Sequence, residues 1–243
     1  MPSFSTTPWP EIERLRDGIT EQIKAAPSVE RAAATFTASF KRAFDSVALA
    51  RMFVLAPMHR LPESEQSWAR ELAASVGRPE VDRNTPVLCL LGTAGDRPEW
   101  NDRTKSAGHR AIPLLDRNFI ANAPMIEGLL RALKLDPQQR TQGGPIQLRP
   151  MAGGLNARFF VDDAAVTLDD QQRHVIASRD FVMNHHIRTV FGMGGSYVTG
   201  EIAIAIIFTT EKLTALEVDR FTTFISTFKM ATSDVASARR FLD

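Results

Sequence analysis

The stretch from Ile202 to Phe208 is apolar at every position, and it restricts the possible folds more than any other segment. It is far shorter than the ~20 residues that a membrane-spanning helix needs, so we expect a strand inside a soluble domain. A strand without polar alternation is typical of a sheet covered on both faces, or of a central position in a sheet. The segments 187–193 and 194–200 predict a preceding strand and a turn, so the two strands should form a hairpin.

Other short apolar segments predict further strands, and apolar residues at every third or fourth position predict helices. Ser28 can cap one helix and Gly77 can end another. The polar, breaker-rich segment 136–144 predicts a mobile loop or an internal boundary, and 169–185 is ambiguous. The expected fold class is therefore α/β (α+β), with long N- and C-terminal helices. Strands are expected at 48–57, 87–91, 109–115 and 155–161, a loop at 92–98, and helices at 11–25, 28–44, 63–76, 122–133 and 216–242.

Composition and charge exclude several classes of protein. The 243 residues are 44% hydrophobic with a net charge of +1, which is ordinary for a globular protein and unlike a disordered one. Lysine and arginine are scattered among acidic residues, so we expect no nucleic-acid binding. The N-terminus has no basic and apolar signal-peptide pattern, and we expect a cytoplasmic protein without membrane contact.

The order of elements and two groups of residues resemble GAF domains. Residues 180–190, followed by Gly200-Glu201-Ile202-Ala203, are similar to the end of that family, with Ala203 or Ala205 where the family usually has glycine. Residues 92–95, 100–103 and 106–114 resemble GAF-like input regions that precede histidine kinase or diguanylate cyclase modules in bacterial signalling proteins. The resemblance implies a GAF/PAS-like central antiparallel sheet flanked by helices. It divides the chain into an N-terminal helical extension, 1–27, and a GAF-like domain, 28–243, that includes the C-terminal helix.

The resemblance also implies a function and partners. A GAF-like module would sense a small molecule held between the sheet and its covering helices. The apolar stripes of the two terminal helices could pack on each other or form the seam of a homodimer, through which the signal would be read. No output module follows within the chain, so the module would act on a partner such as a histidine kinase or diguanylate cyclase, or be an excised part.

One polar cluster is the candidate ligand site. Arginine offers a planar fork for a carboxylate or phosphate, and tryptophan offers a stacking face. We expect these residues to line or gate the mouth of a pocket that takes an anionic or polar ligand. The alternative interpretation is a loop held by its own ion pairs and a buried tryptophan. The candidate residues are Trp100, Asp102, Arg103, His109 and Arg110.

A haem- or metal-binding sensor of the same fold is the second hypothesis, and the cofactor is otherwise unknown. A single histidine holds the iron in many haem proteins, and His109, His185 or His186 could serve. His185 and His186 are neighbours, so on a strand they would point to opposite faces and could not share one metal. The alternative is that they are ordinary surface and core histidines.

Nothing in the sequence predicts an enzyme. Cys89 is the single cysteine and lies in an apolar strand, where a thiol behaves as a small hydrophobe. The glycines at 192–195 precede a strand rather than a helix, so they do not form a dinucleotide-binding loop. The third hypothesis is an enzyme whose motifs are not recognised, although nothing here places a nucleophile beside a base. The fourth is an adaptor that binds no ligand and acts through helix contacts alone.

Overall fold

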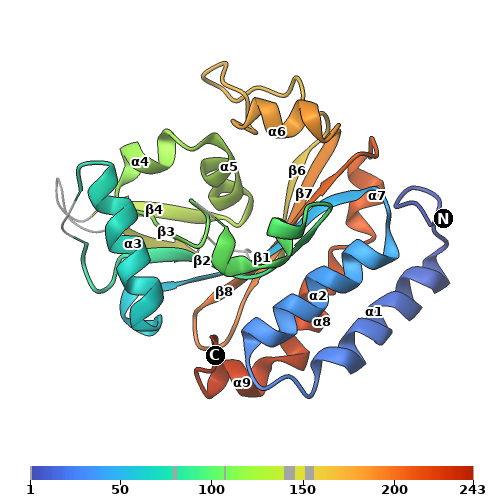
Figure 1. The fold of residues 1–243 in the computed structure, drawn as a ribbon, viewed down its shortest axis with the longest axis horizontal. Helices are drawn as coiled ribbons and strands as arrows, with labels where there is room; N and C mark the ends of the chain where they lie inside the picture. Colours follow the sequence, from blue (N-terminus) through green and yellow to red (C-terminus); the bar gives the residue numbers. More distant parts are fainter. Residues whose placement is uncertain (1, 79–80, 107, 140–145, 151–155, 243) are drawn as a thin grey trace.

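A six-stranded antiparallel sheet forms the middle of the molecule (Figure 1). The structure is a computed structural model that describes residues 2–78, 81–106, 108–139, 146–150 and 156–242. The strand order is β3-β2-β1-β8-β7-β6, and each pair is antiparallel. The strands are β1 (Val47–Pro57), β2 (Pro86–Gly95), β3 (Ala111–Pro113), β6 (Asn156–Val161), β7 (Thr189–Ser196) and β8 (Ile202–Thr209). A separate hairpin joins β4 (Leu135–Gln139) and β5 (Ile146–Pro150).

The apolar run that ends in Phe208 is strand β8, in the interior of the sheet between β1 and β7. Its side chains alternate between two separate apolar cores. Ala203, Ala205 and Ile207 belong to one core, and Ile204, Ile206 and Phe208 to the other. The prediction of a strand covered on both faces is therefore confirmed, because each face of β8 has its own buried cluster.

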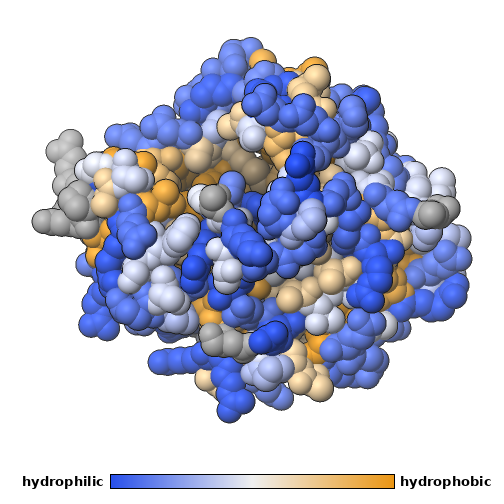
Figure 2. All heavy atoms as spheres, in the orientation of Figure 1, coloured by the Kyte–Doolittle hydropathy of each residue, from blue (hydrophilic) through white to orange (hydrophobic). Residues whose placement is uncertain are grey.

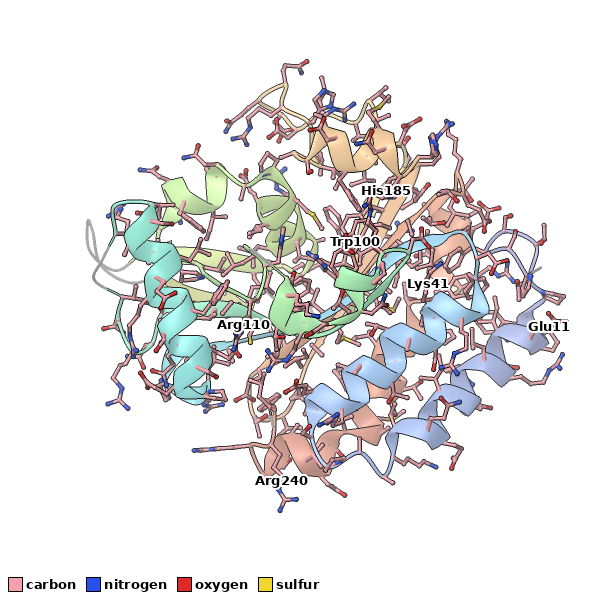
Figure 3. The ribbon with its side chains drawn as sticks, viewed as in Figure 1. Glu11, Lys41, Trp100, Arg110, His185 and Arg240 are labelled. Atoms are coloured by element: carbon pink, nitrogen blue, oxygen red, sulfur yellow. The ribbon has the colours of Figure 1, made fainter. Side chains whose placement is uncertain are left out.

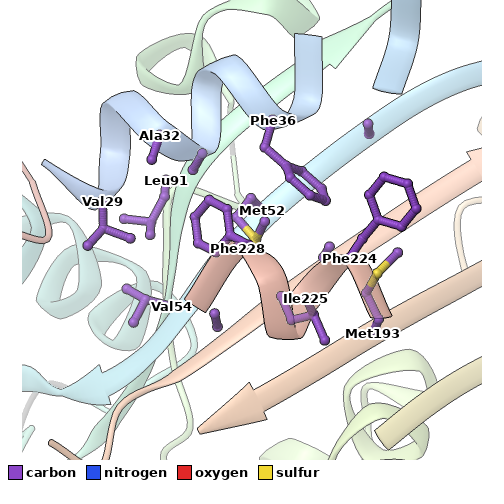
Figure 4. Packing of buried hydrophobic residues seen from close by; sticks show 14 of the residues in the cluster. Val29, Ala32, Phe36, Met52, Val54, Leu91, Met193, Phe224, Ile225 and Phe228 are labelled. Atoms are coloured by element: carbon purple, nitrogen blue, oxygen red, sulfur yellow. The ribbon is translucent and has the colours of Figure 1, made fainter. Parts of the chain in front are cut away.

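Helices α1 (Trp9–Ile23), α2 (Val29–Ala43) and α8 (Thr223–Ala231) form the layer on one face of the sheet (Figure 1). The side chain of Ser28 accepts from the N–H of Arg31 and caps α2. Phenylalanines of α2 and α8 interlock above the sheet, with the ring centroids of Phe36 and Phe228 5.5 Å apart (Figure 4). Helix α1 contributes to the same core, and the division at residue 27 stays a prediction.

Close approach of α2 to the sheet requires a glycine in β2. A Cβ built on Gly92 would lie 2.5 Å from the backbone of Ala33, nearer than any real contact. Glycine at this position therefore lets the helix backbone lie directly on the strand.

The single helix predicted at 216–242 is wrong. The segment forms three short helices instead: α7 (Ala215–Asp219), α8, and α9 (Ser233–Ser237). Phe221, in the break between α7 and α8, is fully buried and stacks edge-on against the Phe4 ring, with centroids 5.0 Å apart. At the second break, the Thr232 hydroxyl lies 2.8 Å from the Tyr197 hydroxyl inside the core. Both breaks therefore coincide with side chains that are buried in the core.

The opposite face of the sheet is covered by shorter elements. Helices α4 (Arg117–Ala121), α5 (Pro124–Ala132) and α6 (Arg179–Asn184) contribute to the core on this face, while α3 (Glu63–Ser75) packs beside β3. Three 3₁₀ turns lie in the connections: η1 (Met58–Arg60), η2 (Pro98–Asn101) and η3 (Arg103–Lys105). Among the described residues, no helix has the length and apolar content to cross a membrane.

Several predicted boundaries move. Strand β2 continues to Gly95, so the loop expected at 92–98 begins at residue 96. The Asn101 side-chain amide accepts a hydrogen bond from the Gly95 N–H (3.0 Å) and donates one to the Gly95 carbonyl (3.1 Å). Strand β7 likewise extends to Ser196, into the expected turn. Residues 135–139 are strand β4 rather than a loop, while 140–144 lie outside the described residues. Strand β3 is shorter than predicted, and only Arg179–Asn184 is α-helical within the ambiguous segment.

Candidate functional site

A cavity of about 620 Å³ lies on the α5–α6 side of the sheet. This volume is within the range of about 300–1,000 Å³ that small-molecule sites occupy. Its walls come from strands β1, β2 and β8, the start of α5, α6 with the loop before it, and the η2–η3 segment. Figure 2 shows a hollow between α5 and α6 whose interior is more apolar than its surroundings. The structure therefore has room for a small ligand on one face of the sheet, in a cavity that is partly open to solvent.

The walls of this cavity are mainly apolar. Leu49 of β1 and Phe208 of β8 are buried side chains on the sheet side. Ile176 and Phe181 come from the opposite wall, and the Phe181 ring packs edge-on against Phe208 with centroids 5.3 Å apart. These side chains favour a ligand with an apolar body, because burying apolar surface is the main source of its binding energy.

Trp100 is fixed in the wall by its own local structure. The Thr93 hydroxyl donates to the Trp100 carbonyl at 2.8 Å, and Asn101 ties the turn to the end of β2. A Cβ at Gly95 would lie 2.8 Å from the Trp100 ring, so the indole packs directly on the strand backbone. Its ring centroid is 5.5 Å from that of Phe181 and 4.6 Å from that of His185. The indole thereby links the sheet to α6.

Arg51 places a positive charge on the inner wall. This residue of β1 is largely buried, and its Nη2 donates to the Ser106 hydroxyl at 3.2 Å. Its Nε is buried without a hydrogen-bond partner, and within the described chain Arg51 makes no ion pair. Burial lowers the pKa of Arg51 to about 10, so the side chain is still protonated at neutral pH. The cavity therefore contains a cation that no carboxylate of the described residues neutralises.

Arg103 and Arg110 belong to a separate ion-pair network centred on Glu65 of α3. Glu65 is buried; Arg110 Nη2 lies 2.7 Å and Arg103 Nη1 3.2 Å from its Oε1. Arg103 also pairs with Glu30 at 2.6 Å, and Arg110 lies over the Trp68 ring. Burial acts to raise the pKa of Glu65, but the hydrogen bonds and charges of the two arginines outweigh it and leave the pKa lowered. This network fastens α2, α3 and the η3 segment together.

The five residues expected at the pocket are thus divided between two places. Trp100 and His109 line the cavity; their role toward a ligand stays a prediction. Asp102, Arg103 and Arg110 are not among the residues that line it, and a role for them in gating it stays a prediction. Asp102 accepts from the N–H of Thr104 at 2.9 Å and caps η3, and these Thr104 hydrogen bonds lower its pKa. Figure 3 shows the separation, with Trp100 near His185 and Arg110 toward α3. Arg103 and Arg110 instead form ion pairs that hold their segment in place, which was the alternative interpretation of this cluster.

The remaining candidate ligands lie off the cavity wall. His185 and His186 end α6, and neither is a lining residue, although the His185 ring packs on Trp100. Among the described residues, no group of three or more His, Cys, Asp or Glu side chains is placed to hold a metal ion. Cys89 of β2 faces the helical core on the other side of the sheet, and burial raises the pKa of its thiol to about 12.

Sequence reasoning missed Arg51 and Ser106. Arg51 is the one charged residue between Val47 and Pro57, a strand otherwise made of apolar residues. A lone charge in a strand covered on both faces must enter a core or a cavity, and that pattern was the available signal. Ser106 lies in a segment without regular periodicity, so only the folded structure brings it to Arg51.

Comparison with known proteins establishes the fold. The chain has a GAF-like fold. A GAF domain from a phosphoenolpyruvate-protein phosphotransferase of Coxiella burnetii has a TM-score of 0.51 at 12% identity, covering 96% of this chain and 97% of that one. The free methionine-R-sulfoxide reductase of Neisseria meningitidis, solved with its substrate, has a TM-score of 0.53 at 10% identity, covering 98% of both chains. Neither a family model nor a curated protein sequence matches the chain.

Proposed function

We propose that this protein is a sensory module that binds a small molecule in the cavity beside β1, β2 and β8. The observation behind this proposal is a partly open cavity of about 620 Å³ with mainly apolar walls and a few polar side chains among its lining residues. Such a combination is typical of small-molecule sites. The GAF domain from Coxiella burnetii has the same fold, which supports a role in signalling.

The proposed signal passes from the cavity to the helices on the other face of the sheet. A ligand shifts a conformational equilibrium only by the difference in its affinity for the two states. Strand β1 lies in both cores, because Leu49 faces the cavity side and Ala50 the helical side. The proposed readout is a homodimer whose terminal helices respond to this strand, acting on a partner such as a histidine kinase or a diguanylate cyclase.

We infer that the module is not an enzyme, even though one protein of similar fold is a reductase. A protein that reduces its substrate with its own thiols needs them beside that substrate. Cys89 is the single cysteine and lies on the face of the sheet opposite the cavity. Its raised pKa keeps the thiol protonated and unreactive.

The first experiment is an absorption spectrum and a native mass spectrum of freshly purified protein. A bound metabolite mass supports the sensory proposal, and a Soret band would favour the haem-binding alternative, with His109 as the cavity-lining histidine. A thermal-shift screen of metabolites follows, on the natural chain and on Val175→Trp, which fills the cavity from its loop wall. Val166→Trp is the matched control, because Val166 is 66% exposed and does not line the cavity. If every compound shifts the Tm of Val175→Trp as much as that of the control, no compound binds in this cavity and the proposal is contradicted.

A further inference from the structure

We propose that the cavity selects a small organic acid, with its carboxylate on Arg51 and an apolar body against the remaining walls. This inference rests on the proposed function and adds the chemical class of the ligand. It depends on a feature that is independent of cavity size: a largely buried cation, Arg51, that no carboxylate of the described residues pairs with.

The other arginines that are well shielded from solvent have partners. Arg103 and Arg110 bind the carboxylate of Glu65, and Arg60 binds that of Glu201. Arg220, which lacks a carboxylate, donates to three backbone carbonyls instead. Within the described part of the chain, Arg51 has a single acceptor, the Ser106 hydroxyl. A buried charge is normally paired, so Arg51 marks the position where an anion completes the structure.

The cavity offers no internal anion that could take this position. Glu99 is the one acidic residue among those that line it, and its side chain is about half exposed and lies 3.9 Å from Arg97. Lys105 and His109 also contribute to the wall. Lys105 lies 3.7 Å from Asp102, so its charge is already paired. Among the described residues, Arg51 is the lining cation that no carboxylate reaches, and its charge favours an incoming anion.

The form of the site favours one carboxylate over a phosphate. A guanidinium presents a planar fork that matches a carboxylate. The Ser106 hydroxyl oxygen accepts a hydrogen bond from Arg51, so its own proton is available to donate to a second ligand oxygen. Phosphate sites typically combine backbone N–H groups at a helix start with several cations. The start of α5 lines this cavity, but its first residue, Pro124, has no N–H to donate. The neighbouring walls are Leu49, Phe208, Ile176 and Phe181, which suit an apolar body.

The test compares acids with amides of the same shape. Three probe pairs differ mainly in charge: phenylacetate and phenylacetamide, hexanoate and hexanamide, and indole-3-acetate and indole-3-acetamide. Binding to the full chain is measured at millimolar concentration by ligand-observed NMR, with calorimetry for any pair that binds. The variants are Arg51→Met, which keeps the length of the side chain and removes the charge, and Arg51→Lys, which keeps the charge and removes the fork. Arg70→Met is the control, because Arg70 lies on the exposed face of α3.

At least one acid should bind in preference to its amide, and Arg51→Met should weaken that acid roughly 10- to 100-fold. Arg51→Lys should retain part of the affinity and Arg70→Met all of it. Selection by charge would be refuted if an acid and its amide bind equally well, or if Arg51→Met binds the acid as tightly as the natural chain does. Either result would leave a ligand-binding cavity in place. If no acid binds, this inference is wrong, and the Val175→Trp screen then decides separately whether the cavity binds small molecules at all.

Discussion

Replacing Arg51 by methionine should stabilise the protein in the absence of ligand. Burial lowers the pKa of Arg51 from its ordinary value to about 10, which corresponds to about 3 kcal/mol against the charged form in the folded state. The substitution also removes one hydrogen bond to a hydroxyl, worth about 1–2 kcal/mol. The free energy of unfolding should therefore rise by about 1–2 kcal/mol, and the Tm by roughly 2–8 °C for a chain of this size.

The pH dependence gives a second signature of the same effect. The folded-state pKa of Arg51 lies below its unfolded value, so the charged side chain destabilises the folded protein at every pH below about 10. This destabilisation fades as the pH rises from about 10 toward the ordinary pKa of arginine, because the folded protein then releases the proton. The advantage of Arg51→Met should therefore stay constant from neutral pH to about pH 9.

Urea denaturation of the natural chain, Arg51→Met and Arg70→Met measures this difference directly. Arg70 pairs with Glu63 on the surface, so its replacement should change stability by less than about 1 kcal/mol. A loss of more than about 1 kcal/mol in Arg51→Met would refute the reasoning. It would show that the guanidinium holds the η3 segment to the sheet through Ser106, rather than waiting for an anion.

Three further predictions test the structure around the site. Gly92→Ala should destabilise the folded protein by about 2–4 kcal/mol, because the new Cβ meets the backbone of α2. Gly18→Ala should stabilise it by up to about 1 kcal/mol, because the space around Gly18 is open. Thermal denaturation measures both changes. Glu65→Gln should destabilise by about 3–5 kcal/mol because two arginines lose their shared carboxylate. The lowered pKa of Glu65 means that its contribution is present above its unfolded pKa and lost as the pH falls through its lower folded pKa, which acid titration by circular dichroism follows. Cys89 should react with a thiol reagent only at the rate of unfolding, and rapid labelling of native protein would contradict its burial.

The central hairpin could be predicted from sequence because its signal is local. An apolar run without polar alternation has few alternatives to a covered strand, and β8 begins and ends within one residue of the expected bounds. The C-terminal segment was mispredicted because its phenylalanines follow helical spacing on average. Spacing shows which side chains are buried, but it does not show where the helix breaks between them. The breaks lie beside Phe221 and Thr232, whose side chains are buried in the core.

The candidate site was predicted only in part because charge pairing is a long-range property. Arg103 and Arg110 have the chemistry of an anion site, yet both bind Glu65, which precedes them by 38 and 45 residues. Arg51 has the same chemistry, and no carboxylate of the described residues reaches it. Arg103 and Arg110 were selected because they are close in sequence to the other candidate residues. Whether an arginine is paired with a carboxylate depends on the folded chain, and sequence proximity does not show it.

The alternation of β1 explains how one strand could link a ligand to the helices. Arg51 faces the cavity, while the next residue, Met52, lies in the helical core with Phe36 and Phe228 (Figure 4). A shift of β1 toward a bound carboxylate would therefore move a side chain beneath α2 and α8. Close packing makes that core intolerant of small displacements, because side chains there cannot move without repacking. A ligand at Arg51 thus has a short physical route to the terminal helices that the proposed dimer would use.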